Sequence, residues 1–280
     1  MRPIFVTQKS LAAFRCYLVE SEKSRATVEK YLHEVRALGH FLAGKALSKA
    51  AILAYREQLK GSFKSSTINA KLSAINSYLE FMQLPLCKVR LLKIQRSAFI
   101  EEKRELTAAQ YHRLLSAARS SGKERLYHLM LTIGSTGIRV GELCYITVEA
   151  AQSGSVELYL KGKCRTILLP QELCKKLLAY ARKHGIEVGP IFCTKSGKPL
   201  DRSNICHEMK KLCALARVTP SKVYPHNLRH LFARSFYAIE HNLCHLADIL
   251  GHSSIETTRI YVAASTRQHE RTLRKMKLVI

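Results

Sequence analysis

The sequence predicts a mainly α-helical (α+β) fold with a small β-sheet, divided into two domains. Its 280 residues exceed the usual size of one domain, about 100–200 residues. Apolar residues recur at helical spacing along most of the chain, whereas two short runs, 156–160 and 164–169, have the composition of strands. Hydrophobic residues make up 47% of the chain, which is enough to bury a core and excludes disorder for most of it.

The first domain, predicted over residues 1–88, is a set of four short helices. Ser48 and Ser65 or Ser66 stand where two of these helices would begin. A basic segment with little periodicity follows, and we interpret residues 89–105 as a linker. The apolar stripes of the four helices are Leu11, Phe14 and Leu18; Val28, Tyr31, Leu32, Val35, Leu38 and Phe41; Ile52, Tyr55 and Leu59; and Ile68, Leu72, Ile75, Tyr78 and Leu79.

The second domain, predicted over residues 106–280, mixes helices with a β-hairpin. Thr107 and Gln110 are spaced as a capping box that opens a helix. Residues 161–163 are typical of the hairpin turn between the two strands. Helices are further predicted over 124–135, 139–146, 171–183 and 204–217, a short strand and a Gly/Pro-rich loop over 185–201, and helical structure over 225–262 with a break at Gly251.

The charge of the chain indicates a polyanionic partner. Lys and Arg number 46 against 21 Asp and Glu, so the formal net charge is +25 and the isoelectric point is near 9.9. The excess is present both before and after residue 100. A field of one sign over a folded body attracts nucleic acid, the commonest polyanion. A membrane surface is the weaker alternative, because no amphipathic segment is set apart for it.

We expect a cytoplasmic protein without cofactor or metal. No apolar run approaches the roughly 18–20 residues that span a bilayer, and the first residues lack the apolar core of a signal peptide. The nine cysteines form no C-x-x-C pair, which favours a reducing compartment over disulfides or a zinc site. The chain has no Gly-rich nucleotide loop and no acidic cluster for paired metals.

Two stretches near the C-terminal end hold candidate chemistry. His226 and Arg229 are three positions apart and would share one face of a helix. Gly251 is typical of a residue that ends a helix, which predicts that His252 lies in a tight corner before the next helix. Taken singly, such histidines are more often caps or surface groups, and Tyr261 would more often be a core residue.

The Ser253 and Glu256 pair is spaced as a capping box for that next helix. Taken together and in order, these residues resemble those of the tyrosine site-specific recombinases, the phage-integrase and Xer family. The resemblance covers most of the chain: residues 1–88 are similar to the helical SAM-like core-binding domain that contacts DNA, and residues 106–280 to the tyrosine-recombinase catalytic domain with its C-terminal helical tail. The matching motifs are TGIRVGEL at 136–143, KGKCR at 161–165, HNLRH at 226–230, LGHS at 250–253 and TTRIY at 257–261.

The resemblance implies a catalytic role for three of these residues. Tyr261 would be the nucleophile and would form a 3′-phosphotyrosyl link with DNA. Arg139 and Arg229 would hold the phosphate, since guanidinium groups stay protonated and form paired hydrogen bonds to oxygens. Because the link conserves the energy of the broken bond, the reaction would require neither metal nor ATP.

The remaining roles are also implied by the resemblance. Lys163 would be the acid for the leaving 5′-oxygen, with Lys161 as the alternative. His226 would be the base, with a pKa near the ordinary 6.5 of histidine, and His252 would donate to a nonbridging oxygen. Glu142 would orient a partner in the site; a plain surface carboxylate is the alternative.

As a member of this family the chain would be a site-specific recombinase of double-stranded DNA. A homotetramer on two DNA sites would exchange strands through a Holliday junction, and an accessory directionality factor could take part. We expect integration and excision of a bacterial mobile element. The alternatives are a Xer-type chromosome or plasmid dimer resolvase or a DNA invertase, followed by a type IB topoisomerase and a catalytically inactive DNA-binding protein.

The ends of the chain carry two further expectations. Residues 265–280 are basic and end in an apolar triplet. This tail would either fold back on its own domain in cis or, as in the family, be donated in trans to a neighbouring protomer, which the triplet favours because it needs a pocket. Since the helical pattern begins almost at residue 1, we expect no separate N-terminal arm-binding domain.

Overall fold

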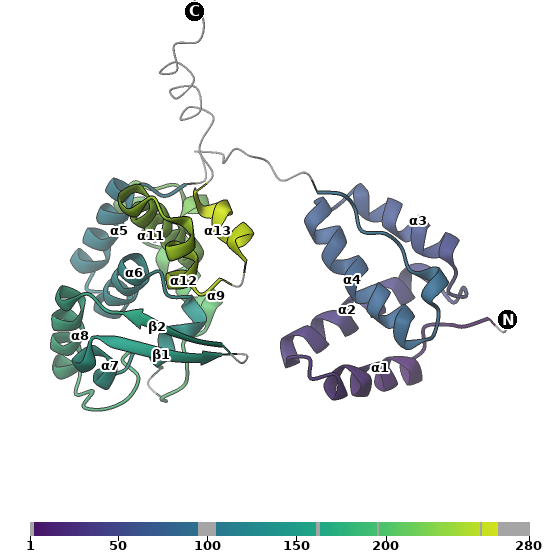
Figure 1. Ribbon diagram of the computed structural model, residues 1–280, viewed down its shortest axis with the longest axis horizontal. Helices are drawn as coiled ribbons and strands as arrows, with labels where there is room; N and C mark the ends of the chain where they lie inside the picture. Colours follow the sequence, from purple (N-terminus) through teal and green to yellow (C-terminus); the bar gives the residue numbers. More distant parts are fainter. Residues whose placement is uncertain (1–2, 95–104, 161–162, 195, 253, 263–280) are drawn as a thin grey trace, which may run out of the picture. The chain divides into compact units, whose positions relative to one another are not determined.

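The computed structural model describes residues 3–94, 105–160, 163–194, 196–252 and 254–262, and the backbone alone of Leu160, Lys163 and Val262. The chain divides into two compact units, Met1–Arg96 and Ser97–Ile280, so the division falls within the segment expected as a linker. Each unit is mainly helical, and the one sheet among the described residues is a two-stranded hairpin in the second unit (Figure 1). The predicted fold class is confirmed.

The first unit contains the four predicted helices, which are coloured purple to blue in Figure 1. Thr7, Ser24 and Ser48 each accept a hydrogen bond from a backbone N–H of the first turn of the helix that they precede. The helix predicted to start at Ser65 or Ser66 starts at Ser65, without a side-chain cap. The four helices are α1 (Gln8–Glu20), α2 (Arg25–Leu42), α3 (Lys49–Lys60) and α4 (Ser65–Phe81).

After α4 the first unit continues into a segment whose backbone is hydrogen-bonded to two asparagine side chains of α4. A short 3₁₀ helix, η1 (Pro85–Cys87), leads into it. Asn76 donates to the carbonyl of Val89 at 2.9 Å and accepts from its N–H at 3.0 Å. Asn69 does the same for Leu92, at 2.9 and 2.7 Å. An amide side chain thus supplies the donor and acceptor that a neighbouring strand would supply.

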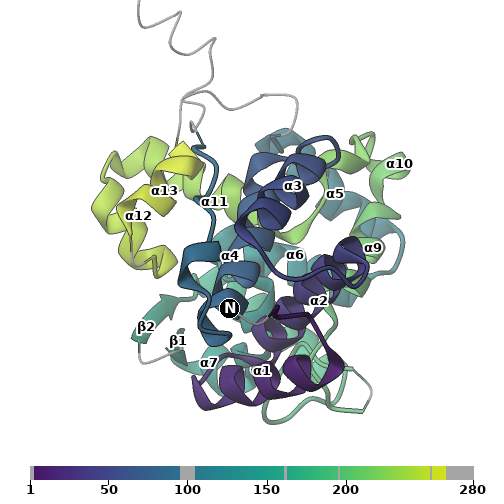
Figure 2. The same cartoon turned by 90° about the vertical axis from the view of Figure 1, so that its right-hand side faces the viewer.

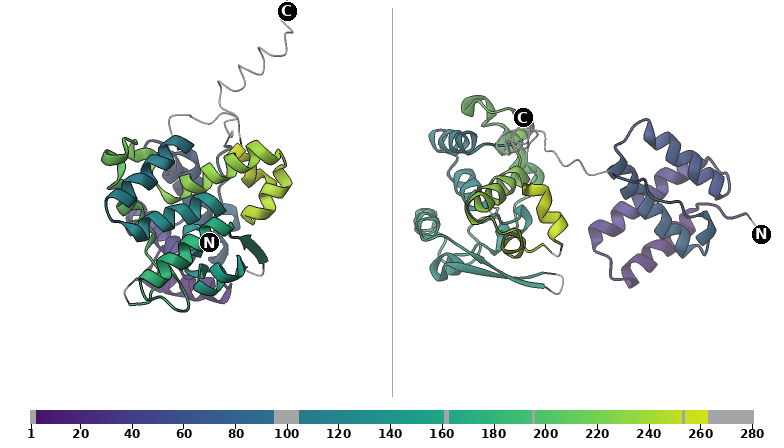
Figure 3. Two further views of the ribbon diagram at one scale, coloured as in Figure 1. Left: turned by 90° about the vertical axis from the view of Figure 1, so that its left-hand side faces the viewer. Right: turned by 45° about the horizontal axis from the view of Figure 1, so that its top comes forward.

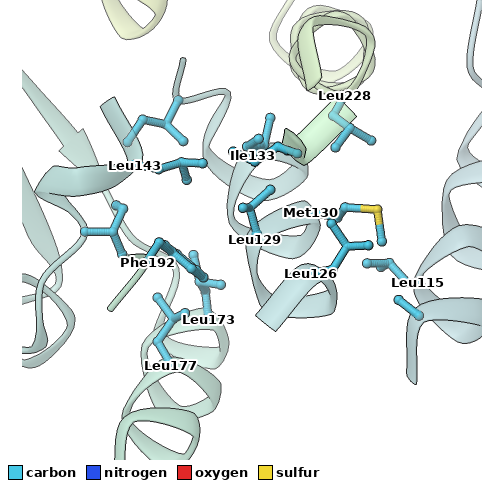
Figure 4. Packing of buried hydrophobic residues seen from close by; sticks show 14 of the residues in the cluster. Leu115, Leu126, Leu129, Met130, Ile133, Leu143, Leu173, Leu177, Phe192 and Leu228 are labelled. Carbon is cyan, nitrogen blue, oxygen red and sulfur yellow. The ribbon is translucent and has the colours of Figure 1, made fainter. Parts of the chain in front are cut away.

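Helix α6 (Glu124–Thr136) contributes to the core of the second unit, and Figure 4 shows its side chains Leu129, Met130 and Ile133 together with those of neighbouring elements. Leu129, Met130 and Ile133 of α6 are buried, with Leu115 of α5 and Leu177 of α8 in the same apolar cluster. The elements in chain order are α5 (Ala108–Ser120), α6 (Glu124–Thr136), η3 (Val140–Tyr145), α7 (Val148–Ser153), β1 (Ser155–Leu160), β2 (Lys163–Leu168), α8 (Gln171–Lys183), α9 (Arg202–Lys210), α10 (Cys213–Ala216), η4 (Pro220–Lys222), α11 (Pro225–Glu240), α12 (Leu243–Leu250) and α13 (Ile255–Val262).

Several predicted features of the second unit are confirmed. The capping box of Thr107 and Gln110 opens α5 with both of its hydrogen bonds. Helix α8 has the predicted bounds. Strands β1 and β2 pair antiparallel, with Ser155 opposite Leu168 at one end. The turn was predicted over residues 161–163, but Lys163 is already the first residue of β2, opposite Leu160, and residues 161–162 lie outside the described residues.

Three predictions for this unit are wrong in detail. The segment predicted as one helix over 204–217 is two helices, α9 and α10, and the buried Leu212 lies in the turn between them. The strand expected within 185–201 is replaced by isolated bridges, one of them from Cys193 to Pro199, since proline has no N–H for a ladder. The helical stretch from residue 225 breaks a second time at His241, which has a φ of 53°.

Two short helices also differ from the prediction. Residues 140–145 form a 3₁₀ helix, where an ordinary short helix was expected. Helix α7 was not predicted, because six residues are too few to show a helical period.

Helices α11, α12 and α13 form a group at one side of the second unit, next to the hairpin (Figures 2 and 3). Tyr261 and Leu250 are buried in a small apolar cluster between these helices. No helix among the described residues is long and apolar enough to cross a membrane.

Candidate active site

The C-terminal end of α12 holds the two arginines singled out from the sequence. Gly251 has a φ of 62° and ends α12 in the left-handed conformation, as predicted. Arg229 donates from Nη2 to the carbonyl of Leu250 at 2.7 Å, and from Nη1 to the carbonyl of Gly137. Arg139 donates from Nη2 to the carbonyl of Gly251 at 3.2 Å. The last carbonyls of a helix carry partial negative charge and therefore bind cations.

Arg229 is a buried cation. Only 2% of its surface is exposed. Burial lowers its pKa to about 10, and the charge of Arg139 acts in the same direction, whereas the Tyr261 hydroxyl acts in the opposite one. At neutral pH the group stays protonated, so the two arginines place two positive charges close together.

Glu142 orients Arg139 at the start of η3. Its Oε2 accepts from the backbone N–H of Arg139 at 2.9 Å, and its Oε1 accepts from Nη1 at 3.0 Å. Glu142 is buried, whereas 42% of the Arg139 side chain is exposed. Arg139 is therefore held from within and still accessible to a ligand, and Arg165 of β2 forms a second ion pair with the same carboxylate.

His252 links Arg229 to α13. Its Nε2 lies 3.0 Å from Nη2 of Arg229, and its Nδ1 lies 2.8 Å from the hydroxyl of Thr258. Because a guanidinium nitrogen can only donate, Nε2 accepts and Nδ1 carries the hydrogen and donates to Thr258. Burial and the charge of Arg229 lower the pKa of His252 to about 4, so the imidazole is neutral at pH 7.

Tyr261 lies among three imidazole rings. Its ring centroid is 4.3 Å from that of His230, 5.4 Å from that of His252 and 5.7 Å from that of His226. Only 5% of Tyr261 is exposed. Tyr261 thus has the core position that the sequence left open for it and also lies beside Arg229.

The two histidines of α11 are less basic than a free imidazole. Burial, followed by the charges of Arg229 and Arg202, lowers the pKa of His226 below its ordinary value. The expectation of an unperturbed pKa for His226 is therefore wrong. Burial, with the charge of His226, lowers the pKa of His230 to about 3. Both rings are therefore neutral at pH 7 and are weaker bases than a free imidazole.

The structure brings most of the predicted site residues together. Arg139, Glu142, Arg229 and His252 meet at the end of α12, and Tyr261 lies beside them with His226. Lys163 is the first residue of β2, opposite Leu160, and its side chain lies outside the described part of the chain, as do Lys161 and Ser253.

Sequence reasoning gave no role to three residues of this site. Arg165 and His230 stand inside the quoted motifs, and Thr258 lies one helical turn before Tyr261, on the same face of α13. Each signal was present, but a motif does not show which of its polar residues point inward. Among the described residues, no group of three or more His, Cys, Asp or Glu side chains could hold a metal ion.

Comparison with known proteins gives the family. Residues 104–268 match the model of the phage integrase family, and residues 11–83 match that of the phage integrase N-terminal SAM-like domain. The tyrosine recombinase XerA of Pyrococcus furiosus is 25% identical over 288 residues, covering 100% of this chain and 98% of the relative. The tyrosine recombinase XerD of Rhizobium meliloti is 26% identical and covers 91% of this chain and 92% of its own length.

Solved structures share the fold. The crystal structure of XerA recombinase superposes with a TM-score of 0.54 and 24% identity, covering 98% of this chain and all of that one. A lambda integrase dimer bound to a COC′ core site superposes with a TM-score of 0.71 and 19% identity, covering 92% and 78%. The chain thus belongs to the phage integrase family and is a tyrosine recombinase, an enzyme of site-specific recombination that cleaves and rejoins DNA through a tyrosine nucleophile.

Proposed function

We propose that Tyr261 attacks a DNA phosphodiester that Arg139 and Arg229 hold at the end of α12. The convergence of both guanidinium groups on the carbonyls of residues 250 and 251, beside the Tyr261 ring, carries this proposal. The transition state of phosphoryl transfer spreads negative charge over the nonbridging oxygens, which two preorganised cations stabilise. The tyrosine oxygen bonds to phosphorus, and the 5′-oxygen leaves and takes up a proton.

The other side chains have the following roles in this proposal. His226 is neutral and accepts the phenol proton. Lys163 gives the leaving 5′-oxygen its proton, and Glu142 keeps Arg139 in place. His252 donates to a nonbridging oxygen once Arg229 turns to the phosphate and Nε2 takes up a proton, which the adjacent phosphate charge favours.

The burial of Tyr261 adds a step to the proposed reaction. With 5% of the residue exposed, its hydroxyl has little access to a phosphate in the described arrangement. We infer that α13 shifts when DNA binds, so that the Tyr261 hydroxyl reaches the phosphate. Energy from phosphate contacts to the arginines compensates for the lost packing of the Tyr261 ring.

A suicide substrate tests the nucleophile. This is a DNA duplex nicked beside the cleaved phosphate, so that the leaving strand diffuses away and the covalent complex accumulates. We expect a covalent protein–DNA band with the wild-type chain and none with Tyr261→Phe. Lys163→Ala should cleave slowly and recover on a 5′-thio substrate, whose leaving group needs no acid. An adduct with Tyr261→Phe overturns the assignment, and a lack of thio rescue moves the acid role to Lys161 or His226.

We propose that the substrate is double-stranded DNA with a specific recombination site, bound by a homotetramer on two sites in the cytoplasm. The similar structures include recombinases bound to DNA and a lambda integrase tetramer bound to a Holliday junction. A mixture of the chain with a labelled synthetic Holliday junction, analysed by mass, should contain four protomers per junction. Efficient relaxation of a supercoiled plasmid without a recombination site would favour the topoisomerase alternative.

We propose integration and excision of a bacterial mobile element as the biological reaction. Resolution of chromosome or plasmid dimers is the second candidate, favoured by Xer relatives that match this chain over nearly their whole length. Plasmids carrying the DNA that flanks the gene distinguish the two. Excision of the intervening segment as a circle with a joined end supports a mobile element. Recombination only between two copies of a single chromosomal site supports dimer resolution.

A further inference from the structure

We propose that Arg165 is a positioning residue of the active site, which fixes strand β2 against Glu142 and against the end of α12. This inference rests on the proposed function of Arg139 and His252. It extends that proposal to a residue of the hairpin that does not itself contact the phosphate.

One guanidinium group joins three segments that are far apart in the sequence. Nη2 of Arg165 donates to Oε2 of Glu142 in η3, and Nη1 donates to the carbonyl of Leu250 at the end of α12. Nη1 also lies 3.5 Å from the carbonyl of Ile249. The carbonyl of Leu250 thus accepts from both Arg165 and Arg229, and Glu142 pairs with both Arg165 and Arg139.

The two arginines that pair with Glu142 differ in exposure. The side chain of Arg165 is 12% exposed, and both of its terminal nitrogens already donate to protein oxygens. Arg139 shares Glu142 with it and is 42% exposed. Of the two arginines that pair with Glu142, Arg139 is therefore the more open to a ligand, whereas Arg165 lies mostly covered. Arg165 also lies two residues after Lys163 in β2, so the same strand carries the proposed acid.

Gly251 makes room for this side chain. A Cβ atom added at Gly251 would overlap the Arg165 side chain. The φ of Gly251, 62°, is also unfavourable for residues other than glycine. The helix-ending glycine thus lets Arg165 cross over the α12 terminus to reach Glu142. Arg165 thereby links the position of strand β2 to the position of the turn that precedes His252.

The contacts of Arg165 explain why its loss would affect Arg139 and Arg229, the residues proposed to hold the phosphate. Glu142 is 6% exposed, and a buried carboxylate is stable only when it is paired and hydrogen-bonded. Without Arg165, the Glu142 carboxylate would be paired with Arg139 alone. The carbonyl of Leu250 would lose one of its two donors and keep only Arg229. We expect Arg139 and Arg229 to shift toward these vacated acceptors and away from the geometry that binds phosphate.

The test compares cleavage with binding in the full chain. Arg165→Ala should form the covalent adduct on the suicide substrate roughly 10- to 100-fold more slowly at saturating DNA, the usual loss when an outer partner of a functional group is removed. The midpoint of DNA binding should change less than about threefold. Added methylguanidinium should restore part of the rate of Arg165→Ala and leave the wild-type rate unchanged. Arg165→Lys keeps the charge but cannot make both bonds, so its rate should be intermediate.

Two controls separate this inference from loss of folding and from failure of the proposed function. Arg125→Ala removes an arginine whose ion pair with Glu208 is partly exposed, and it should react at the wild-type rate. Adduct formation by Tyr261→Phe would overturn the proposed function, whatever the Arg165 variants do. If Arg165→Ala does not fold, the comparison is made with Arg165→Lys, Glu142→Gln and the double variant, which should be no slower than the slower single one.

The inference is overturned by either of two results. A wild-type rate for Arg165→Ala shows that the contacts have no effect on catalysis. A loss of DNA affinity as large as the loss of rate, without rescue by methylguanidinium, shows that Arg165 binds the DNA directly or supports the fold only. For the double variant, multiplication of the two single effects shows that Arg165 does not act through Glu142.

Discussion

Nη2 of Arg229 lies 3.0 Å from Nε2 of His252, whose other ring nitrogen lies 2.8 Å from the hydroxyl of Thr258. This chain of hydrogen bonds runs from α11 through the corner after α12 into α13. It ties the buried arginine to the helix that carries Tyr261. In the proposed function, a phosphate that draws Arg229 toward itself would remove a partner from His252, and we expect the change to reach α13 through Thr258.

Replacement of Arg229 by lysine should abolish most of the cleavage activity. One ammonium group cannot reproduce the donors that the guanidinium directs at Gly137, Leu250 and His252. We expect adduct formation on the suicide substrate to fall about 10²–10³-fold. Urea denaturation should show a free energy of unfolding lower by roughly 1–3 kcal/mol, because buried acceptors lose their donors. A rate within threefold of wild type would contradict the role of the buried guanidinium.

Replacement of Thr258 by valine should reduce cleavage about tenfold, equivalent to about 1.4 kcal/mol, within the range for an unpaired buried group. Valine has nearly the shape of threonine but cannot accept from Nδ1 of His252, which then loses its orientation. Thr258→Ser keeps the hydroxyl and should keep most of the rate. Thr257→Val, at an exposed position of the same helix, is the matched control. Equal rates for Thr257→Val and Thr258→Val would refute the argument.

The partly buried imidazoles of His230 and His252 should make the fold less stable in mild acid. The pKa is about 3 for His230 and about 4 for His252 in the folded chain, against about 6.5 when the chain is unfolded. Between these values the unfolded state binds more protons, so the free energy of unfolding decreases as the pH falls from 6.5 toward 4. The thermal midpoint at pH 7, 5.5 and 4.5 measures this decrease. His230→Phe should make it shallower; an unchanged slope would remove His230 as a cause.

Motifs and periodicity predicted the helices and the hairpin because local signals determine them. Thr107 and Gln110 define the start of α5 by their own hydrogen bonds, and Gly251 ends α12 because a residue with positive φ is required there. The second break in the segment from residue 225 has a weaker signal. His241 adopts a positive φ although it is not glycine, and Asn242 caps α12 through its side chain.

The site was predicted as a set of residues but not as a network. The family motifs contain Arg139, Glu142 and Arg229, yet the contact of Arg165 with the carbonyl of Leu250 joins residues 85 positions apart. Such a contact depends on how β2 and α12 pack, which a single sequence does not record. The lowered pKa of His226 has the same origin, because burial is the largest of its causes.

The two asparagines of α4, Asn69 and Asn76, should limit local opening of the segment that follows the four helices. Asn76 forms two hydrogen bonds with Val89, and Asn69 forms two with Leu92. If each bond contributes about 1 kcal/mol, Asn76→Ala should raise local opening at least about tenfold. Hydrogen exchange measured by mass spectrometry should then be faster in residues 88–94 and unchanged in α2. Asn204→Ala, at an exposed site of α9, should leave this segment at its wild-type rate. Equal protection in Asn76→Ala and wild type would mean that burial of Val89, which is 4% exposed, suffices to hold the segment.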